Sequence, residues 1–276
     1  MSVEKGGVID VWAQAPTERM AAAPWMASLR RWIGQTGAPH ATSVEETLAA
    51  MDAAGVEIAL LAAWSAPGGH LISNEELEAQ IDAAPSRFRG LISPDLAQPM
   101  EGVRAIKARA GDPRFVGVRI TPWVWDLPPN DRRYYPIYAA CVEAGLPFCT
   151  QIGHTGPLMR SETGRPIPYL EDVLLEFPEL VVVGGHVGFP WIAELTSLMA
   201  KFPNLHLDTS AYALSRLPPD FVALMKGVGR GRVMFGTNWP MLAPERCLAG
   251  LDALALTEAD RESFLSGAAR RVFKLG

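Results

Sequence analysis

Histidine is the residue type in this sequence most suited to chemistry, because imidazole titrates near neutral pH and can move a proton or bind a metal. His154 stands in QIGHTGP and His186 in GGHVGFPW, each beside glycine and just after an apolar run. Asn238, in FGTNWP, offers an amide that can hydrogen-bond a developing oxyanion. We predict His186, His154 and Asn238 as catalytic residues, with His186 moving the proton.

Other side chains after apolar runs suit substrate binding. The guanidinium of Arg119 has the donor geometry to clamp a carboxylate. The amides of Gln14 and Gln151 can donate and accept hydrogen bonds, while the indoles of Trp12 and Trp239 can pack on a substrate. The predicted substrate-binding residues are therefore Gln14, Trp12, Arg119, Gln151 and Trp239.

The apolar runs themselves are candidate strands. Their starts lie about 32 residues apart on average, the length of one strand-plus-helix unit. They are rich in Val, Ile and Leu without strict alternation, as is typical of parallel strands covered on both faces. The runs are VIDV from Val8, VEIALLAAW from Val56, FRGLIS from Phe88, VGVRI from Val116, PFCTQI from Pro147, LVVVGGH from Leu180, LHLDTS from Leu205 and VMFGTN from Val233.

Helix start signals lie between these runs. Ser43 with Glu46, and Ser73 with Glu76, have the spacing of a capping box. Strand and helix thus alternate, which predicts an α/β fold, a single (β/α)8 TIM barrel over residues 1–276. An open doubly wound sheet is the alternative, but no GxGxxG motif follows the first run.

The first interval between runs is the longest, at 48 residues. We expect residues 13–42 to form an insertion that lies over the barrel mouth as a lid. Barrel active sites lie at the carboxyl ends of the strands, so the candidate residues would converge beneath it.

Composition excludes several classes of protein. Hydrophobic residues make up 49% and the net charge is -5 with no basic stripe, so nucleic acid is not an expected partner. No apolar stretch reaches the roughly 18 residues of a membrane span, and MSVEKGGVID lacks a signal-peptide pattern. The three cysteines show no CxxC spacing. We expect a cytoplasmic protein with a small-molecule substrate.

Seven motifs follow one another along the chain: VIDVWAQ, SNEELEAQIDAAPSRFRGLIS, GVRI, GHTGP, GGHVGFPW, LHLDTSAY and VMFGTNWPM. As an ordered set they resemble the amidohydrolase-related superfamily, of the aminocarboxymuconate-semialdehyde decarboxylase type. The resemblance implies a hydrolase or a carbon-carbon lyase in a TIM barrel, acting on a small carboxylated, cyclic or unsaturated substrate, and it implies a homodimer.

The resemblance also implies a metal site, from which this sequence departs. The family has His-x-His after strand 1, one histidine each after strands 5 and 6, and an aspartate after strand 8. His154 and His186 match the later histidines, but Trp12, Gln14 and Asn238 stand at the other positions. Indole offers no ligand and neutral amides are weak ones for zinc. We therefore expect no tightly bound metal cofactor.

Two other functions remain open. One is a metal-dependent hydrolase or decarboxylase in which His154, His186 and amide ligands hold zinc. The other is a barrel that binds small molecules without catalysis. Metal analysis and a His186 variant distinguish these possibilities.

Each candidate residue also has a purely structural interpretation. The two histidines would bond backbone or lie in the core, Asn238 would hold a turn, and Arg119 would pair with a helix carboxylate. Trp12 and Gln14 would fill the volume of a lost metal site. Asp208, in LDTSAY, is expected to hold a turn, with a reserve role as a base.

Overall fold

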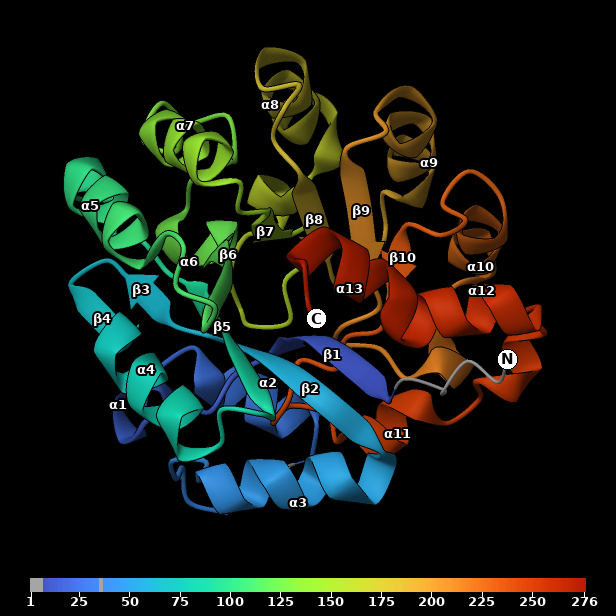
Figure 1. Cartoon of the computed structure of the whole chain (residues 1–276), viewed down its shortest axis with the longest axis horizontal. Helices are drawn as coiled ribbons and strands as arrows, with labels where there is room; N and C mark the ends of the chain where they lie inside the picture. The colour runs from blue at the N-terminus through green and yellow to red at the C-terminus, as the bar shows by residue number, and fades with distance from the viewer. Residues whose placement is uncertain (1–6, 35–36) are drawn as a thin grey trace.

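The computed structural model describes residues 7–34 and 37–276. Its centre is an eight-stranded parallel sheet in the order β1-β2-β5-β6-β7-β8-β9-β10, with helices outside it (Figure 1). The strands are β1 Val8–Ala13, β2 Val56–Ala62, β5 Phe88–Ile92, β6 Phe115–Ile120, β7 Phe148–Gln151, β8 Val182–Gly185, β9 Leu205–Asp208 and β10 Val233–Met234. Seven of the eight contain only residues that are buried or partly buried, as expected when helices cover a parallel sheet.

The last strand returns to the first and nearly closes the barrel. Val11 N donates to Phe235 O at 3.0 Å, and Ala13 pairs with Trp239 in an isolated parallel bridge. Asp10, 1% exposed, accepts hydrogen bonds from the backbone N and the hydroxyl of Thr237. The predicted TIM barrel is confirmed.

The helices begin where the sequence places them in the two clearest cases. Ser43 and Ser73 both cap helices, and in each the glutamate three residues on bonds back to the serine N. The helices around the barrel are α3 Val44–Ala54, α4 Asn74–Ala83, α5 Pro99–Arg109, α6 Pro122–Trp125, α7 Tyr135–Ala144, α8 Glu171–Glu176, α9 Ile192–Lys201, α10 Pro219–Lys226, α11 Pro244–Leu248, α12 Glu258–Glu262 and α13 Ala268–Phe273. None of the described helices is long and apolar enough to cross a membrane.

One predicted strand is shorter than its apolar run. The run VEIALLAAW ends as a strand at Ala62, and Trp64 belongs instead to a hairpin of β3 Trp64–Ala66 and β4 Gly69–Ile72. The turn uses Gly68 and Gly69 with φ values of +93° and +138°, a backbone region that suits glycine.

The long first connection contains two short helices, α1 Glu18–Ala21 and α2 Met26–Trp32. Thr17 caps α1, and its hydroxyl also donates to Leu71 O at 2.6 Å, which ties the connection to the hairpin. Residues 35 and 36 of the predicted 13–42 insertion lie outside the described residues. That this segment acts as a lid, and that the chain is one domain, remain predictions.

Candidate active site

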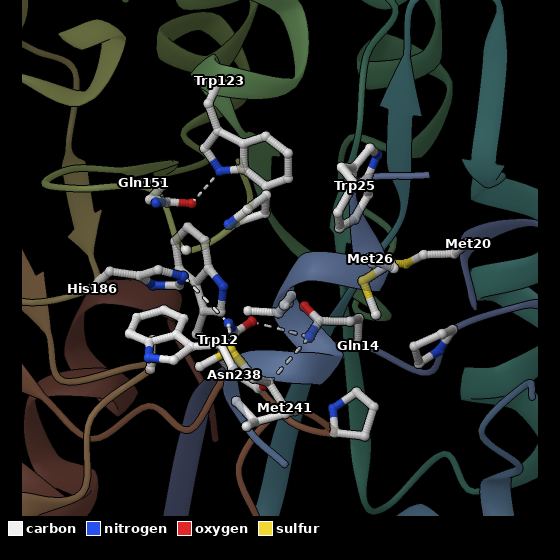
Figure 2. Close-up of a pocket in the computed structure, with 18 of the residues that line it drawn as sticks. Trp12, Gln14, Met20, Trp25, Met26, Trp123, Gln151, His186, Asn238 and Met241 are labelled. Carbon is white, nitrogen blue, oxygen red and sulfur yellow. Dashed lines mark hydrogen bonds between the residues drawn. The ribbon is translucent and has the colours of Figure 1, made fainter. Parts of the chain in front are cut away.

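A cavity of about 190 Å³ lies at the carboxyl ends of the strands, beneath α1 and α2. Figure 2 shows polar groups of His186, Asn238 and Gln14 on the barrel side and Met20, Trp25 and Met26 from the first connection on the other. The described residues that line the cavity include no Asp, Glu, Lys or Arg. The site is therefore apolar, with a few neutral polar groups.

The structure brings six of the eight predicted site residues to the cavity wall: Trp12, Gln14, Gln151, His154, His186 and Asn238. Arg119 and Trp239 do not line it. Arg119 is 2% exposed, and its guanidinium carbon lies 4.5 Å from the centroid of the Trp12 ring. Trp239 Nε1 donates to Thr47 Oγ1 on α3 at 3.1 Å, which turns this indole towards a helix. The guanidinium of Arg119 thus lies against the Trp12 ring, and direct contact of Arg119 with a substrate stays a prediction.

His186 is held by residues at the end of β9. Its Nδ1 lies 2.6 Å from Ser210 Oγ, and Ser210 Oγ donates to Asp208 Oδ1 at 2.5 Å. Burial lowers the pKa of His186 to about 3, and the charge of Arg119 acts in the same direction. His186 is therefore neutral at physiological pH.

The other two predicted catalytic residues differ in their bonding. Asn238 Nδ2 lies 3.4 Å from His186 Nε2, and Asn238 Oδ1 accepts from Gln14 Nε2 at 3.1 Å. His154 is half-buried between Trp32 and Phe189, with ring centroids 5.7 and 6.1 Å away, and burial lowers its pKa. Asn238 thus belongs to a bonded network at the cavity floor, whereas His154 belongs to the apolar rim.

Backbone geometry at the site is unusual for residues with side chains. His186, Val187, Ala211 and Asn238 have φ values of 73°, 63°, 66° and 67°. Non-glycine residues rarely adopt this left-handed region, and such conformations cluster at functional sites. His186 follows β8 and Asn238 follows β10, and the two side chains meet at 3.4 Å across the end of β9.

Sequence reasoning missed an aromatic cluster above the site. The rings of Trp25 and Trp64 stack at 5.9 Å, and Trp25 meets Trp123 edge-on at 4.9 Å. Trp123 Nε1 also donates to Gln151 Oε1 at 2.5 Å, which orients that amide. The eight tryptophans in 276 residues were a signal of an aromatic site, but their spacing could not show which of them meet.

Known proteins resemble this chain along most of its length. Gamma-resorcylate decarboxylase from Rhizobium sp. (strain MTP-10005) is 22% identical, over 82% of this chain and 85% of that protein. An uncharacterised TIM-barrel protein from Bordetella bronchiseptica has a TM-score of 0.83 and 27% identity, covering 97% of this chain and 98% of that one. The 5-carboxyvanillate decarboxylase from Novosphingobium aromaticivorans, solved with manganese, has a TM-score of 0.73 and 19% identity, covering 99% of this chain and 97% of that one. At this identity the two proteins share a fold.

The expectation of a site without a metal cofactor is wrong, because manganese is bound in related decarboxylases such as the Novosphingobium enzyme. Even so, residues 7–34 and 37–276 contain no group of three or more His, Cys, Asp or Glu side chains that could hold a metal ion. His154 and His186 are the two imidazoles at the cavity, and the nearby amides of Gln14 and Asn238 bond to protein groups. This set of side chains does not fit the usual ligands of a catalytic divalent metal.

The sequence matches one family over almost its whole length, residues 9–275. This match confirms the resemblance drawn from the ordered motifs, and the relatives confirm an enzyme of the amidohydrolase superfamily. The chain belongs to the amidohydrolase family.

Proposed function

We propose that this protein is a decarboxylase that removes the carboxylate of a small hydroxylated aromatic acid as CO2. The observation that carries the proposal is the cavity itself, which has indole and thioether walls, neutral polar groups on the barrel side and no charged lining among its described residues. The names of its relatives, gamma-resorcylate and 5-carboxyvanillate decarboxylases, support the same substrate class.

An uncharged site favours loss of CO2. A carboxylate beside Trp12 and Trp25 gives up water and finds no cationic partner among the described residues that line the cavity, which do not include Arg119. As the carbon-carbon bond breaks, its charge spreads into the ring, where desolvation costs less. The amide of Asn238 would orient the polar substituents of the ring, because its NH2 group faces the cavity beside His186 Nε2.

His186 is the group we assign to proton transfer. Its Nε2 relays the proton of a ring hydroxyl next to the carboxylate to the ring carbon that bears the carboxylate, and the imidazole, which burial keeps neutral, holds that proton only in passing. The bond from that carbon to CO2 then breaks, and its electron pair restores the aromatic ring as a phenolate. One proton moves from oxygen to carbon and CO2 leaves, so the charge of the substrate passes to the phenolate product.

The test is release of CO2 from 2,6-dihydroxybenzoate and from 5-carboxyvanillate by the purified protein, with MnCl2 either added or omitted. We expect CO2 and the matching phenol in equal amounts, and we expect His186→Gln to lower kcat by at least about a hundredfold. His40→Ala is the matched control, because that histidine is 73% exposed and outside this cavity. No CO2 from either acid under both conditions would refute the proposal.

The homodimer that the resemblance implies remains a prediction, and analytical ultracentrifugation of the purified protein tests it.

A further inference from the structure

One end of the hydrogen-bonded network at the cavity floor is a cation. Arg119 Nη2 donates to Gln14 Oε1 at 2.8 Å, and a guanidinium has only donors. Gln14 must therefore turn its oxygen towards Arg119 and its nitrogen away. That nitrogen donates to Asn238 Oδ1 at 3.1 Å and to the carbonyl of Trp239.

The other end is a carboxylate. Asp208 is 0% exposed, and its Oδ1 accepts from both the hydroxyl of Ser210, at 2.5 Å, and the backbone N of Ser210, at 2.8 Å. Because the one hydroxyl hydrogen of Ser210 goes to Asp208, Ser210 Oγ can only accept from its other neighbours. Those neighbours are the backbone N of His186 at 3.1 Å and His186 Nδ1 at 2.6 Å. His186 must then carry its hydrogen on Nδ1 and leave Nε2 bare.

The hydrogen-bond directions set by Arg119 and by Asp208 are compatible at the contact between Asn238 and His186. Asn238 accepts through Oδ1 from Gln14, so its Nδ2 carries the hydrogens that face the bare His186 Nε2, at 3.4 Å. Every link runs from donor to acceptor in one direction, from the buried cation to the buried carboxylate. Side-chain amides and neutral imidazole have two orientations or tautomers each, and here the charged ends select one of each. The links in order are Arg119, Gln14, Asn238, His186, Ser210 and Asp208.

We infer that Arg119, Ser210 and Asp208 are positioning residues, which fix His186 as the tautomer with a bare Nε2 and direct the NH2 group of Asn238 towards the same point of the cavity. The catalytic consequence rests on the proposed function, in which Nε2 is the proton acceptor. The tautomer itself does not rest on it. A substrate hydroxyl would replace the long contact from Asn238 at Nε2, and the Asn238 amide would then be free to bond a substrate oxygen.

The tautomer can be measured without any substrate. In protein labelled with 15N-imidazole histidine, a bare ring nitrogen and a protonated one have well-separated chemical shifts, and the five histidines are assigned through single variants. We expect wild-type His186 to show a protonated Nδ1 and a bare Nε2 near pH 8. Ser210→Ala removes the acceptor of the Nδ1 hydrogen, so signal from the Nε2-protonated tautomer should appear, and Ser210→Thr should restore the wild-type pattern.

A matched control separates this role from mere packing. Thr150 on β7 is 0% exposed with an unpartnered hydroxyl, so Thr150→Val also changes a buried hydroxyl but should leave the His186 signals and turnover unchanged. For a substrate that releases CO2, Ser210→Ala should lower kcat on the order of a hundredfold with a much smaller change in KM. Arg119→Met tests the other end, since it should free the amide of Gln14 and reduce kcat in the same way.

Two results would overturn the inference: an Nε2-protonated His186 in the wild type, or the same tautomer in Ser210→Ala as in the wild type. Both are read from the spectrum alone. If the spectrum is as expected and neither aromatic acid loses CO2, the proposed function fails and the positioning network stands.

Discussion

Asn238 Nδ2 lies 3.4 Å from His186 Nε2, although 52 residues separate the two along the chain. Both residues have left-handed backbone conformations, with φ values of 67° and 73°. The resemblance of the sequence to its superfamily implies an aspartate at position 238, where this chain has a neutral amide. An uncharged neighbour leaves His186 neutral, as its burial already favours.

Restoring the acid at this position should change metal binding. Asn238→Asp places a carboxylate beside His186, and carboxylate oxygens are better ligands for manganese than a neutral amide. We expect the variant to bind Mn2+ at least roughly tenfold more tightly than the wild type, by isothermal titration calorimetry. Gln98→Glu is the control, since it makes the same amide-to-acid change at an exposed residue before α5. Equal affinities in wild type and Asn238→Asp would contradict the prediction.

Gly185 leaves room for the indole that replaces a family ligand. A Cβ at this residue would lie 2.5 Å from Cζ3 of Trp12, closer than atoms can approach. Gly185→Ala should therefore lower the free energy of unfolding by about 1–3 kcal/mol, measured by urea denaturation. Gly37→Ala, which meets no atom within 4 Å, should have little effect. Adding Trp12→Phe to Gly185→Ala should recover part of the loss, and a purely additive result would count against the contact.

Trp25 should determine affinity for an aromatic ligand. It lies in the connection between β1 and α3, and its ring packs on Trp64 and Trp123 at the cavity. Trp25→Ala is expected to weaken binding of 2,6-dihydroxybenzoate by about tenfold, or roughly 1.4 kcal/mol, in calorimetric titration. Leu175→Ala, at a residue 55% exposed on α8, should bind as the wild type does. Unchanged affinity in Trp25→Ala would show that the connection does not cover the ligand.

His206, on β9, should make stability depend on pH. Burial lowers its pKa to about 4, and its Nδ1 is buried without a partner. The unfolded chain, in which this imidazole titrates near 6.5, then binds more protons than the folded one between about pH 4 and 6.5. The contribution of neutral His206 to the free energy of unfolding is therefore present above pH 6.5. It is lost as the pH falls towards 4, and the loss is roughly 3 kcal/mol at most.

His206→Gln removes that titration, so the difference in unfolding free energy between wild type and variant should shift in favour of the variant as the pH falls from 7 to 4. Comparison at each pH cancels the opposite contributions of Asp10 and Asp208, whose pKa values are raised by burial to about 7 and about 6. His40→Gln, at an exposed histidine, serves as the control. A difference that stays constant with pH would contradict the assignment.

The barrel and six of the residues that line the cavity could be predicted from local sequence signals. Apolar runs at regular spacing and the capping boxes at Ser43 and Ser73 are local signals, because strand burial and helix starts depend on residues near in sequence. In a parallel barrel all strands end at the same face, so residues such as His186 and Asn238 could be placed together from their positions alone.

Which side chains meet, and which way they point, depends on contacts between distant parts of the chain. Arg119 lies on β6, where every residue is buried. Because buried and exposed residues do not alternate along this strand, the sequence could not show whether Arg119 lines the cavity or lies inside the barrel. Its bond to Gln14 spans 105 residues, and that contact exists only because the barrel brings the end of β1 close to β6, three places away in the strand order. The orientation of the Gln14 amide and the tautomer of His186 follow from such contacts, since each depends on donors and acceptors that distant strands bring to the same point.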